Sequence, residues 1–372
     1  MRKLTVLAVL ACLVRLPAGA QTDYPLFRDT ANLQPADSGR LSLTIENLNY
    51  LRNYEWFGNI PLSYTLLGYQ LVPQLNYQLN ERISFRGGIF LRREFGRPGL
   101  VTVEPVFTAK YQKKGLTFLM GTLQGALNHR FIEPLYNPER IITSRNEQGL
   151  QLTLDKRRFW MDWFIDWRKS IILNDPFREE LTTGFSTRTR LIKGPRVTLE
   201  LPAQMLIAHK GGQISSSPDP IESLFNTAIG LSLKASTDGG FLRGINTDHH
   251  FVYYRNISGN KLQLYNHGTG WLSSITFRSR INIDLDLRYW RGHRFFGPVG
   301  MPLYNSISEK IAGYGEPDRE LLFATLIYDK QLFPNVAIDM RLEPYYDLKN
   351  RFLEYGYSVF LRFNKDFFLK RL

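Results

Sequence analysis

The histidines carry the pattern that comes closest to a catalytic site. Among the six histidines of the 372-residue chain, His249 and His250 directly follow Asp248. A carboxylate beside a histidine can support a base that activates a hydroxyl nucleophile or a water molecule. Adjacent residues of a β-strand point to opposite faces, however, so His249 and His250 cannot both serve one site within a regular strand.

Other catalytic and cofactor-binding motifs are absent from the sequence. It contains no G-x-S-x-G turn, no H-E-x-x-H helix and no phosphate-binding loop. The single cysteine, Cys12, lies in a segment that we expect to be removed, which excludes disulfides and thiolate metal sites from the mature chain. We therefore predict a protein that is not an enzyme and that binds no cofactor and no metal.

The N-terminus has the features of an export signal. Arg2 and Lys3 precede the apolar stretch 4–14, and the sequence at 18–20 resembles a cleavage site. An alternative is a lipoprotein anchored through Cys12. No later segment has 18 consecutive apolar residues, so we expect no spanning helix. An exported chain of this kind is either soluble beyond the inner membrane or a β-barrel in an outer membrane.

Apolar and charged residues alternate over segments of about ten residues, as a lipid-exposed barrel requires. In 281–289, five apolar residues alternate with Asn282, Asp284, Asp286 and Arg288. A soluble β-sandwich also alternates, but its strands are mostly shorter and its outer faces carry mixed polar residues. Here one face is heavily charged and the other is rich in Trp, Tyr and Phe, which favours the barrel.

We predict an all-β fold: a transmembrane, antiparallel, up-and-down barrel of sixteen strands, with fourteen or eighteen as alternatives. The expected strands are 40–52, 62–79, 81–94, 99–112, 116–127, 148–155, 158–169, 179–191, 196–209, 223–236, 241–255, 261–278, 280–291, 319–329, 335–347 and 351–363. Short connections alternate with long ones, as expected for periplasmic turns and external loops. The predicted parts are a signal peptide (1–20), a short periplasmic lead-in (21–39), the barrel (40–363) and a periplasmic tail (364–372).

In this layout the sequence resembles the bacterial outer-membrane porins. The segment 354–363, with Gly356 and a final Phe363, is similar to the C-terminal assembly signal of that class. The resemblance implies an outer-membrane location, recognition by the barrel-assembly machinery and a possible homo-oligomer. In sixteen-stranded porins the connection after the fifth strand commonly folds into the lumen. By this resemblance the segment 128–147 would form a constriction; the alternative is a folded external loop. The constriction candidates are Arg130, Glu133, Glu139 and Arg140.

A sixteen-stranded barrel leaves a water-filled channel whose charges tune which solutes pass. The candidate pore-lining residues are the charged residues of the predicted inward faces: Arg82, Arg86, Arg92, Glu104, Lys110, Asp162, Asp166, Arg188, Glu200, Asp284, Asp286, Arg288, Asp339, Arg341 and Glu343. Opposed basic and acidic walls would orient dipolar solutes. Alternatively, neighbouring charges pair across the sheet and stiffen the wall without setting selectivity.

These features predict an outer-membrane channel for passive or weakly selective diffusion of small hydrophilic solutes. One alternative is a barrel that serves as a scaffold or partner in surface-polysaccharide handling or protein secretion. Another is an outer-membrane hydrolase, for which His249 is the residue to test. The net charge of +13 comes from dispersed basic residues, which argues against nucleic-acid binding. Basic residues at turns, such as Lys113 and Lys114, would contact anionic headgroups, so outer-membrane lipids are the expected partners.

Overall fold

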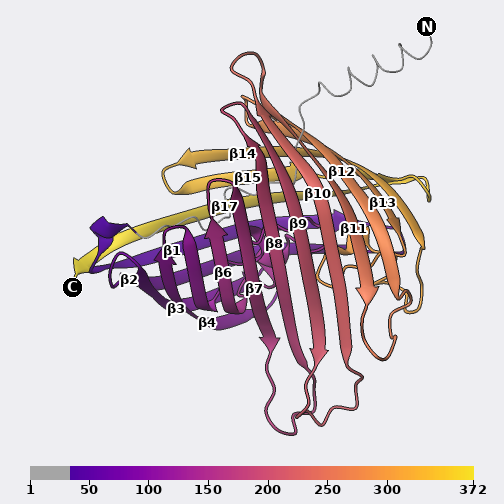
Figure 1. Ribbon diagram of the computed structural model, residues 1–372, viewed down its shortest axis with the longest axis horizontal. Helices are drawn as coiled ribbons and strands as arrows, with labels where there is room; N and C mark the ends of the chain where they lie inside the picture. The colour runs from indigo at the N-terminus through magenta and orange to yellow at the C-terminus, as the bar shows by residue number, and fades with distance from the viewer. Residues whose placement is uncertain (1–33) are drawn as a thin grey trace.

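The computed structural model describes residues 34–372, whose strands form one sheet closed into a barrel (Figure 1). The strands are β1 (Arg40–Glu55), β2 (Tyr64–Gln78), β3 (Ile83–Glu94), β4 (Thr102–Lys113), β5 (Leu116–Thr122), β6 (Gln148–Asp155), β7 (Phe159–Lys169), β8 (Glu179–Lys193), β9 (Val197–Gly211), β10 (Glu222–Ser236), β11 (Leu242–Asn256), β12 (His267–Ser279), β13 (Ile283–His293), β14 (Asp318–Phe333), β15 (Val336–Leu342), β16 (Tyr345–Asp347) and β17 (Phe352–Arg371). Each pairs antiparallel with its neighbours, and β1 pairs with β17 to close the sheet. The predicted export signal lies outside the described residues.

The wall has sixteen strands, as predicted. The short strands β15 and β16 both pair with β14 on one side and with β17 on the other, so they are two parts of one wall strand. The interruption falls at Glu343 and Pro344, because proline has no N–H to donate to a neighbouring strand. An all-β antiparallel barrel with sixteen wall strands is therefore confirmed.

Within residues 34–372, four short helices accompany the strands: η2 (Pro35–Asp37), η3 (Ala126–Asn128), α2 (Arg140–Thr143) and η4 (Pro302–Tyr304). Both η3 and α2 belong to the connection between β5 and β6, and η4 belongs to the connection between β13 and β14. None of the helices in the described part of the chain is long and apolar enough to cross a membrane.

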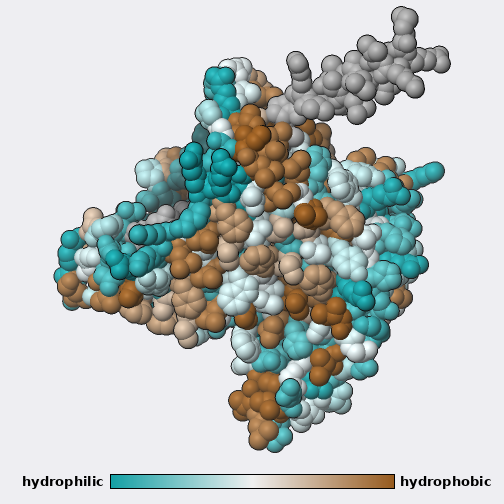
Figure 2. All heavy atoms as spheres, viewed as in Figure 1, coloured by the Kyte–Doolittle hydropathy of each residue, from teal (hydrophilic) through white to brown (hydrophobic). Residues whose placement is uncertain are grey.

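The side chains of each strand alternate between the lumen and the outer surface. On β13, Asp284, Asp286 and Arg288 are buried, whereas Ile283 and Leu287 are exposed. This period of two follows from the pleat of a strand, and it puts apolar residues on the side that faces lipid. Figure 2 shows hydrophobic patches, interspersed with hydrophilic ones, over the outer surface of the strands nearest the viewer.

Short turns join the strands at one end of the barrel. Between β4 and β5 the chain reverses at Lys114 and Gly115, which have φ angles of 48° and 80°. Two successive residues with positive φ form the type of two-residue turn whose twist matches an antiparallel hairpin. We assign this end to the periplasm and the end with long connections to the outside.

The last strand continues through the segment that was expected to form a periplasmic tail. β17 runs to Arg371 and stays paired with β1 beyond Phe363. Asp366 anchors this extension, since its carboxylate accepts hydrogen bonds from Arg40 and from the hydroxyl of Thr44. The tail is therefore part of the wall.

Two long connections, residues 123–147 and 294–317, fill much of the lumen. The first contacts the inner wall, where the backbone N–H of Ile132 donates to the side chain of Gln204 at 3.1 Å. The second packs against the first so closely that a Cβ on Gly300 would lie 2.0 Å from the carbonyl oxygen of Pro134. Buried residues of both connections and of several strands form one apolar cluster. We call these two connections together the plug.

Candidate functional site

The predicted pore-lining residues fall into three groups. Arg82 lies in an exposed periplasmic turn beside Glu81. Five line polar cavities inside the barrel: Arg86, Arg92, Glu104, Lys110 and Asp166. The others are buried or nearly buried on the inner face: Asp162, Arg188, Glu200, Asp284, Asp286, Arg288, Asp339, Arg341 and Glu343. Their proposed role in selectivity stays a prediction.

Many of the inward charges neutralise one another within the wall. Arg341 contacts Asp339 at 2.8 Å, and Arg288 contacts Asp286 at 2.9 Å. A buried charge is tolerated only with a partner, because leaving water is costly. This pairing is the arrangement expected if inward charges stiffen the wall.

The segment 128–147 lies inside the lumen, and its charged residues hold it there. All four constriction candidates contact inward side chains: Arg130 lies over the ring of Trp160, Glu133 pairs with Arg288, Glu139 with Arg52, and Arg140 with Asp166. These residues therefore anchor the plug.

Two ionisable groups of this segment, His129 and Glu147, are fully buried and face each other. The Nδ1 of His129 bonds to Asp162, and its Nε2 lies 2.7 Å from Glu147, which also accepts a hydrogen bond from Tyr136 at 2.8 Å. Burial alone would lower the pKa of His129, but the two facing carboxylates raise it to about 10. The imidazole is thus charged at neutral pH. Because both of its nitrogens are engaged, it is not available as a base.

A second histidine, His249, lies on the outer face of β11 and bonds to two hydroxyls. Its Nδ1 is 2.9 Å from the Oγ of Ser273 on β12, and its Nε2 is 2.8 Å from the Oγ1 of Thr247. Ser273 is the direct cross-strand partner of His249. The indole N–H of Trp271 donates to Ser273 Oγ at 2.7 Å. We call these four residues the outer cluster.

The outer cluster can hold a serine ready for proton transfer. With the imidazole proton on Nε2, that N–H donates to Thr247, and Nδ1 accepts from the hydroxyl of Ser273. This is the relation between a nucleophile and its general base, with a third group that orients the base. Within residues 34–372 no carboxylate bonds to the ring of His249, so the hydroxyl of Thr247 takes the orienting position.

On β13 and β14, beside the outer cluster, the lipid-facing surface changes from apolar to charged. Ser273 pairs across the sheet with Tyr289. Towards the external end, the outward residue after Tyr289 on β13 is Arg291, and on β14 Leu322 is followed outwards by Glu320. Aromatic girdles mark the edges of the apolar band in such barrels. On β10 and β11 the next outward residues towards the external end, Ile229 and Phe251, are still apolar and exposed, so the outer cluster lies within the apolar outer surface near its external edge.

A similar pair lies closer to the external rim. His209 Nδ1 and Ser223 Oγ are 2.8 Å apart at the ends of β9 and β10, where they form a cross-strand pair. Only one hydrogen bond to the His209 ring is present in residues 34–372, so this base lacks the second contact that orients His249. The rim pair provides a matched comparison.

Sequence reasoning found His249 but missed its partners Ser273, Thr247 and Trp271. Thr247 and Ser273 are polar residues at outward positions of strands predicted to face lipid, and this was the only signal for them. The register between β11 and β12 was required to place Ser273 opposite His249. Among residues 34–372, no group of three or more His, Cys, Asp and Glu could hold a metal ion.

Comparisons with known proteins bear on both fold and activity. A family model described as lipid A 3'-O-deacylase-type matches residues 33–372. The outer membrane protein OprD from Pseudomonas aeruginosa is similar in structure, with a TM-score of 0.50 and 10% identity over 88% of this chain and 94% of that one. A loop-deletion variant of OmpT, an outer membrane protein of Vibrio cholerae, has a TM-score of 0.52 and 7% identity over 87% and 99% of the two chains. No curated protein matches the chain significantly.

These matches confirm one expectation and overturn another. The structural similarity confirms the porin-like outer-membrane barrel architecture and supports an outer-membrane location, and at such low identity it shows the fold alone. The family match contradicts the prediction that the protein is not an enzyme, because deacylases are hydrolases. That prediction relied on motifs within single segments. A cross-strand pair such as His249 and Ser273 leaves no such motif.

Proposed function

Because the chain belongs to the lipid A 3'-O-deacylase-type family, we propose that it is an outer-membrane hydrolase that cleaves an acyl ester of a lipid A-type glycolipid. The observation that carries the choice of site is the 2.9 Å contact between Ser273 Oγ and His249 Nδ1 on the lipid-facing wall. Polar side chains are costly in contact with lipid, and a polar cluster there is a functional candidate by default.

The reaction proceeds in two balanced steps. Ser273 Oγ bonds to the ester carbonyl carbon while its proton passes to His249 Nδ1. The bond from that carbon to the sugar oxygen then breaks, and the sugar oxygen takes the proton from His249 and leaves as an alcohol. Water next attacks the acyl-serine with His249 again as base, which releases the fatty acid and restores Ser273. Trp271 supplies an N–H beside Ser273 for the negative charge on the carbonyl oxygen.

The position of the outer cluster suits a substrate that stays in the membrane. A glycolipid in the outer leaflet would keep its charged headgroup level with Arg291 while its acyl esters reach the level of Ser273. The fatty acid chain would then lie along the apolar wall below, beside residues such as Leu231, which pairs across the sheet with His249. The substrate would not need to enter the lumen.

The test measures fatty acid release from lipid A-type glycolipid in vesicles that contain the purified barrel. Wild-type protein is expected to release fatty acid, and Ser273→Ala should lower the rate at least about 100-fold. Ser223→Ala, which alters the rim pair, should stay within about twofold of wild type, as exposed substitutions usually do.

Three results would contradict this proposal. Loss of activity in Ser223→Ala, with full activity in Ser273→Ala, would move the site to the rim pair. Retention in both variants would exclude both serines as nucleophiles. A folded wild-type barrel that releases no fatty acid would overturn the hydrolase itself. Folding is checked by heat-modifiable migration in gels.

A second candidate function is slow passage of small hydrophilic solutes. The plug closes much of the lumen, which argues against a wide pore. Polar cavities of about 370 and 260 Å³ nevertheless remain beside β3 and β4. They are the observation that favours a channel.

A further inference from the structure

The two polar cavities follow one another along the same strands. The first is lined by Arg86 on β3 and Lys110 on β4, and the second by Arg92 on β3 and Glu104 on β4. Arg86 lies nearer the short turn before β3, and Arg92 lies nearer the long connection after it. We therefore call them the periplasmic cavity and the external cavity.

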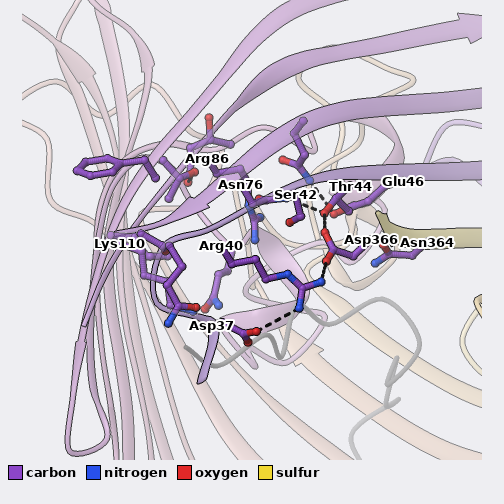
Figure 3. A pocket seen from close by; sticks show the side chains of 18 of the residues that line it. Asp37, Arg40, Ser42, Thr44, Glu46, Asn76, Arg86, Lys110, Asn364 and Asp366 are labelled. Atoms are coloured by element: carbon purple, nitrogen blue, oxygen red, sulfur yellow. Dashed lines mark hydrogen bonds and ion pairs between the residues drawn. The ribbon is translucent and has the colours of Figure 1, made fainter. Parts of the chain in front are cut away.

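Polar side chains from several strands line the periplasmic cavity. Figure 3 shows Arg40 of β1 bonded to Asp37 and to Asp366 of β17 at this cavity. The cavity thus lies inside the closure of the barrel, where the extension of β17 covers β1. Its polar lining is suited to water and to small charged solutes.

An ion pair between Arg145 and Glu46 separates the two cavities. Glu46 lines the periplasmic cavity and Arg145 lines the external cavity, and the guanidinium of Arg145 donates to the carboxylate of Glu46. Two glutamines position the pair. Arg145 also donates to the side-chain oxygen of Gln70 at 3.2 Å, and the amide of Gln74 donates to Glu46 at 3.0 Å.

This ion pair is easier to break than the pairs that anchor the plug. The side chains of Arg145 and Glu46 are 26% and 17% exposed, compared with 4% and 5% for Arg52 and Glu139. Water screens the first pair and can solvate both groups after they separate, whereas separating the second would leave charges buried without partners. The connection 123–147 therefore takes part in one ion pair that is hard to break, Arg52–Glu139, and in one that is easier to break, Arg145–Glu46.

We propose that the Arg145–Glu46 ion pair is the gate of a conduit through which small anionic solutes cross the barrel. This inference rests on the second candidate function, solute passage. The charged residues that line the external cavity favour anions: Arg92, Arg140, Arg145 and Arg168 against Glu104 and Asp166. When the gate opens, Arg145 exchanges the carboxylate of Glu46 for a passing anion, so the gate residue also selects the solute.

The experiment records single-channel currents of the full chain in planar bilayers with potassium chloride as the probe. Wild type should show rare, brief openings. The double variant Glu46→Gln with Arg145→Gln should raise the time-averaged conductance at least about threefold, because neutral amides replace the ion pair. The exchange variant Glu46→Arg with Arg145→Glu should return the conductance to the wild-type level, which a merely loosened plug would not do.

A matched control breaks an ion pair elsewhere on the inner wall. Asp347 on β16 contacts Arg319 at 3.0 Å and lines neither cavity, so Asp347→Asn removes a carboxylate from an ion pair away from the gate. Its conductance should equal that of wild type. An increase as large as that of the gate variant would overturn the assignment of the gate to Arg145 and Glu46.

The outcomes distinguish failure of the gate assignment from failure of the channel function on which it rests. No conductance in either wild type or the double glutamine variant would remove the conduit and with it the second candidate function. Equal conductance in both would leave a channel but overturn the gate. Reversal potentials that indicate a preference for potassium would overturn the anionic solute class. None of these results depends on hydrolase activity.

Discussion

The two faces of β11 use adjacent histidines in opposite ways. On the outer face, His249 is bonded to two hydroxyls and is open to the lipid side. On the inner face, His250 is 1% exposed, and its nearest charged neighbour, Asp248, is 3.8 Å away. Neither nitrogen of His250 has a hydrogen-bond partner within residues 34–372. The inner histidine is enclosed by packing, whereas the outer one is oriented for proton transfer.

This difference shows how one wall can separate stability from chemistry. The inner face holds the plug in place through buried charges and rings, and around His250 it is closed by packing. On the outer face, the polar groups of the outer cluster bond to one another. Lipid offers no hydrogen bonds, so such groups persist only where they satisfy each other. A substrate that is itself a lipid has direct access to them.

The largest effect should come from replacing the two histidines one at a time. His249→Ala removes the proposed general base and should lower fatty acid release by about 10²–10⁴-fold. His250→Ala should leave the rate per folded molecule close to that of wild type. The comparison uses the vesicle assay with heat-modifiable migration as the folding check. Equal losses in both variants would show that the outer face has no special role.

A smaller effect is expected for stability, and here the inner side of the wall should be the more sensitive one. Glu133 of the plug accepts hydrogen bonds from Arg288 and Tyr304, so Glu133→Gln should destabilise the barrel by about 1.5–3 kcal/mol. Glu320 on the outer face accepts from Tyr289 at 2.6 Å and lies near Lys349. Its replacement by Gln should cost at most about 1 kcal/mol. Thermal midpoints of gel migration measure both. A larger shift for Glu320→Gln would contradict the assignment of stability to the inner face.

The wall was predictable from sequence because its signal is local. Alternation within about ten residues fixes which face meets lipid, and the same alternation is enough to place His249 and His250 on opposite faces. The extension of β17 was missed because Phe367, Phe368 and Leu369 are consecutive apolar residues that break the alternation. Phe367 and Phe368 pair with β1, more than 300 residues away in sequence, and Leu369 lies at the bulge beside them.

The candidate site was not predictable because it depends on register. His249 and Ser273 are separated by a connection whose length the sequence left uncertain: the second strand was expected from 261, but it begins at His267. A shift of one residue would turn Ser273 to the other face. The opposite orientation of the two histidines was deduced correctly. The conclusion against catalysis is contradicted by the family match, and it did not consider that a neighbouring strand can bring a hydroxyl to a single histidine.

The smallest effect concerns the residue that orients the base. Thr247→Val removes the hydroxyl that holds His249 Nε2 and should raise the barrier by about 0.5–1.5 kcal/mol, a two- to twelvefold fall in kcat. Because Thr247 acts through His249 and does not touch the substrate, KM should stay unchanged, and Thr247→Ser should restore the rate. Thr227→Val on β10 is the matched control, since its hydroxyl donates to the backbone of Gln204 instead. A change in KM alone, or no rescue by serine, would mean that Thr247 shapes the lipid surface and does not orient the base.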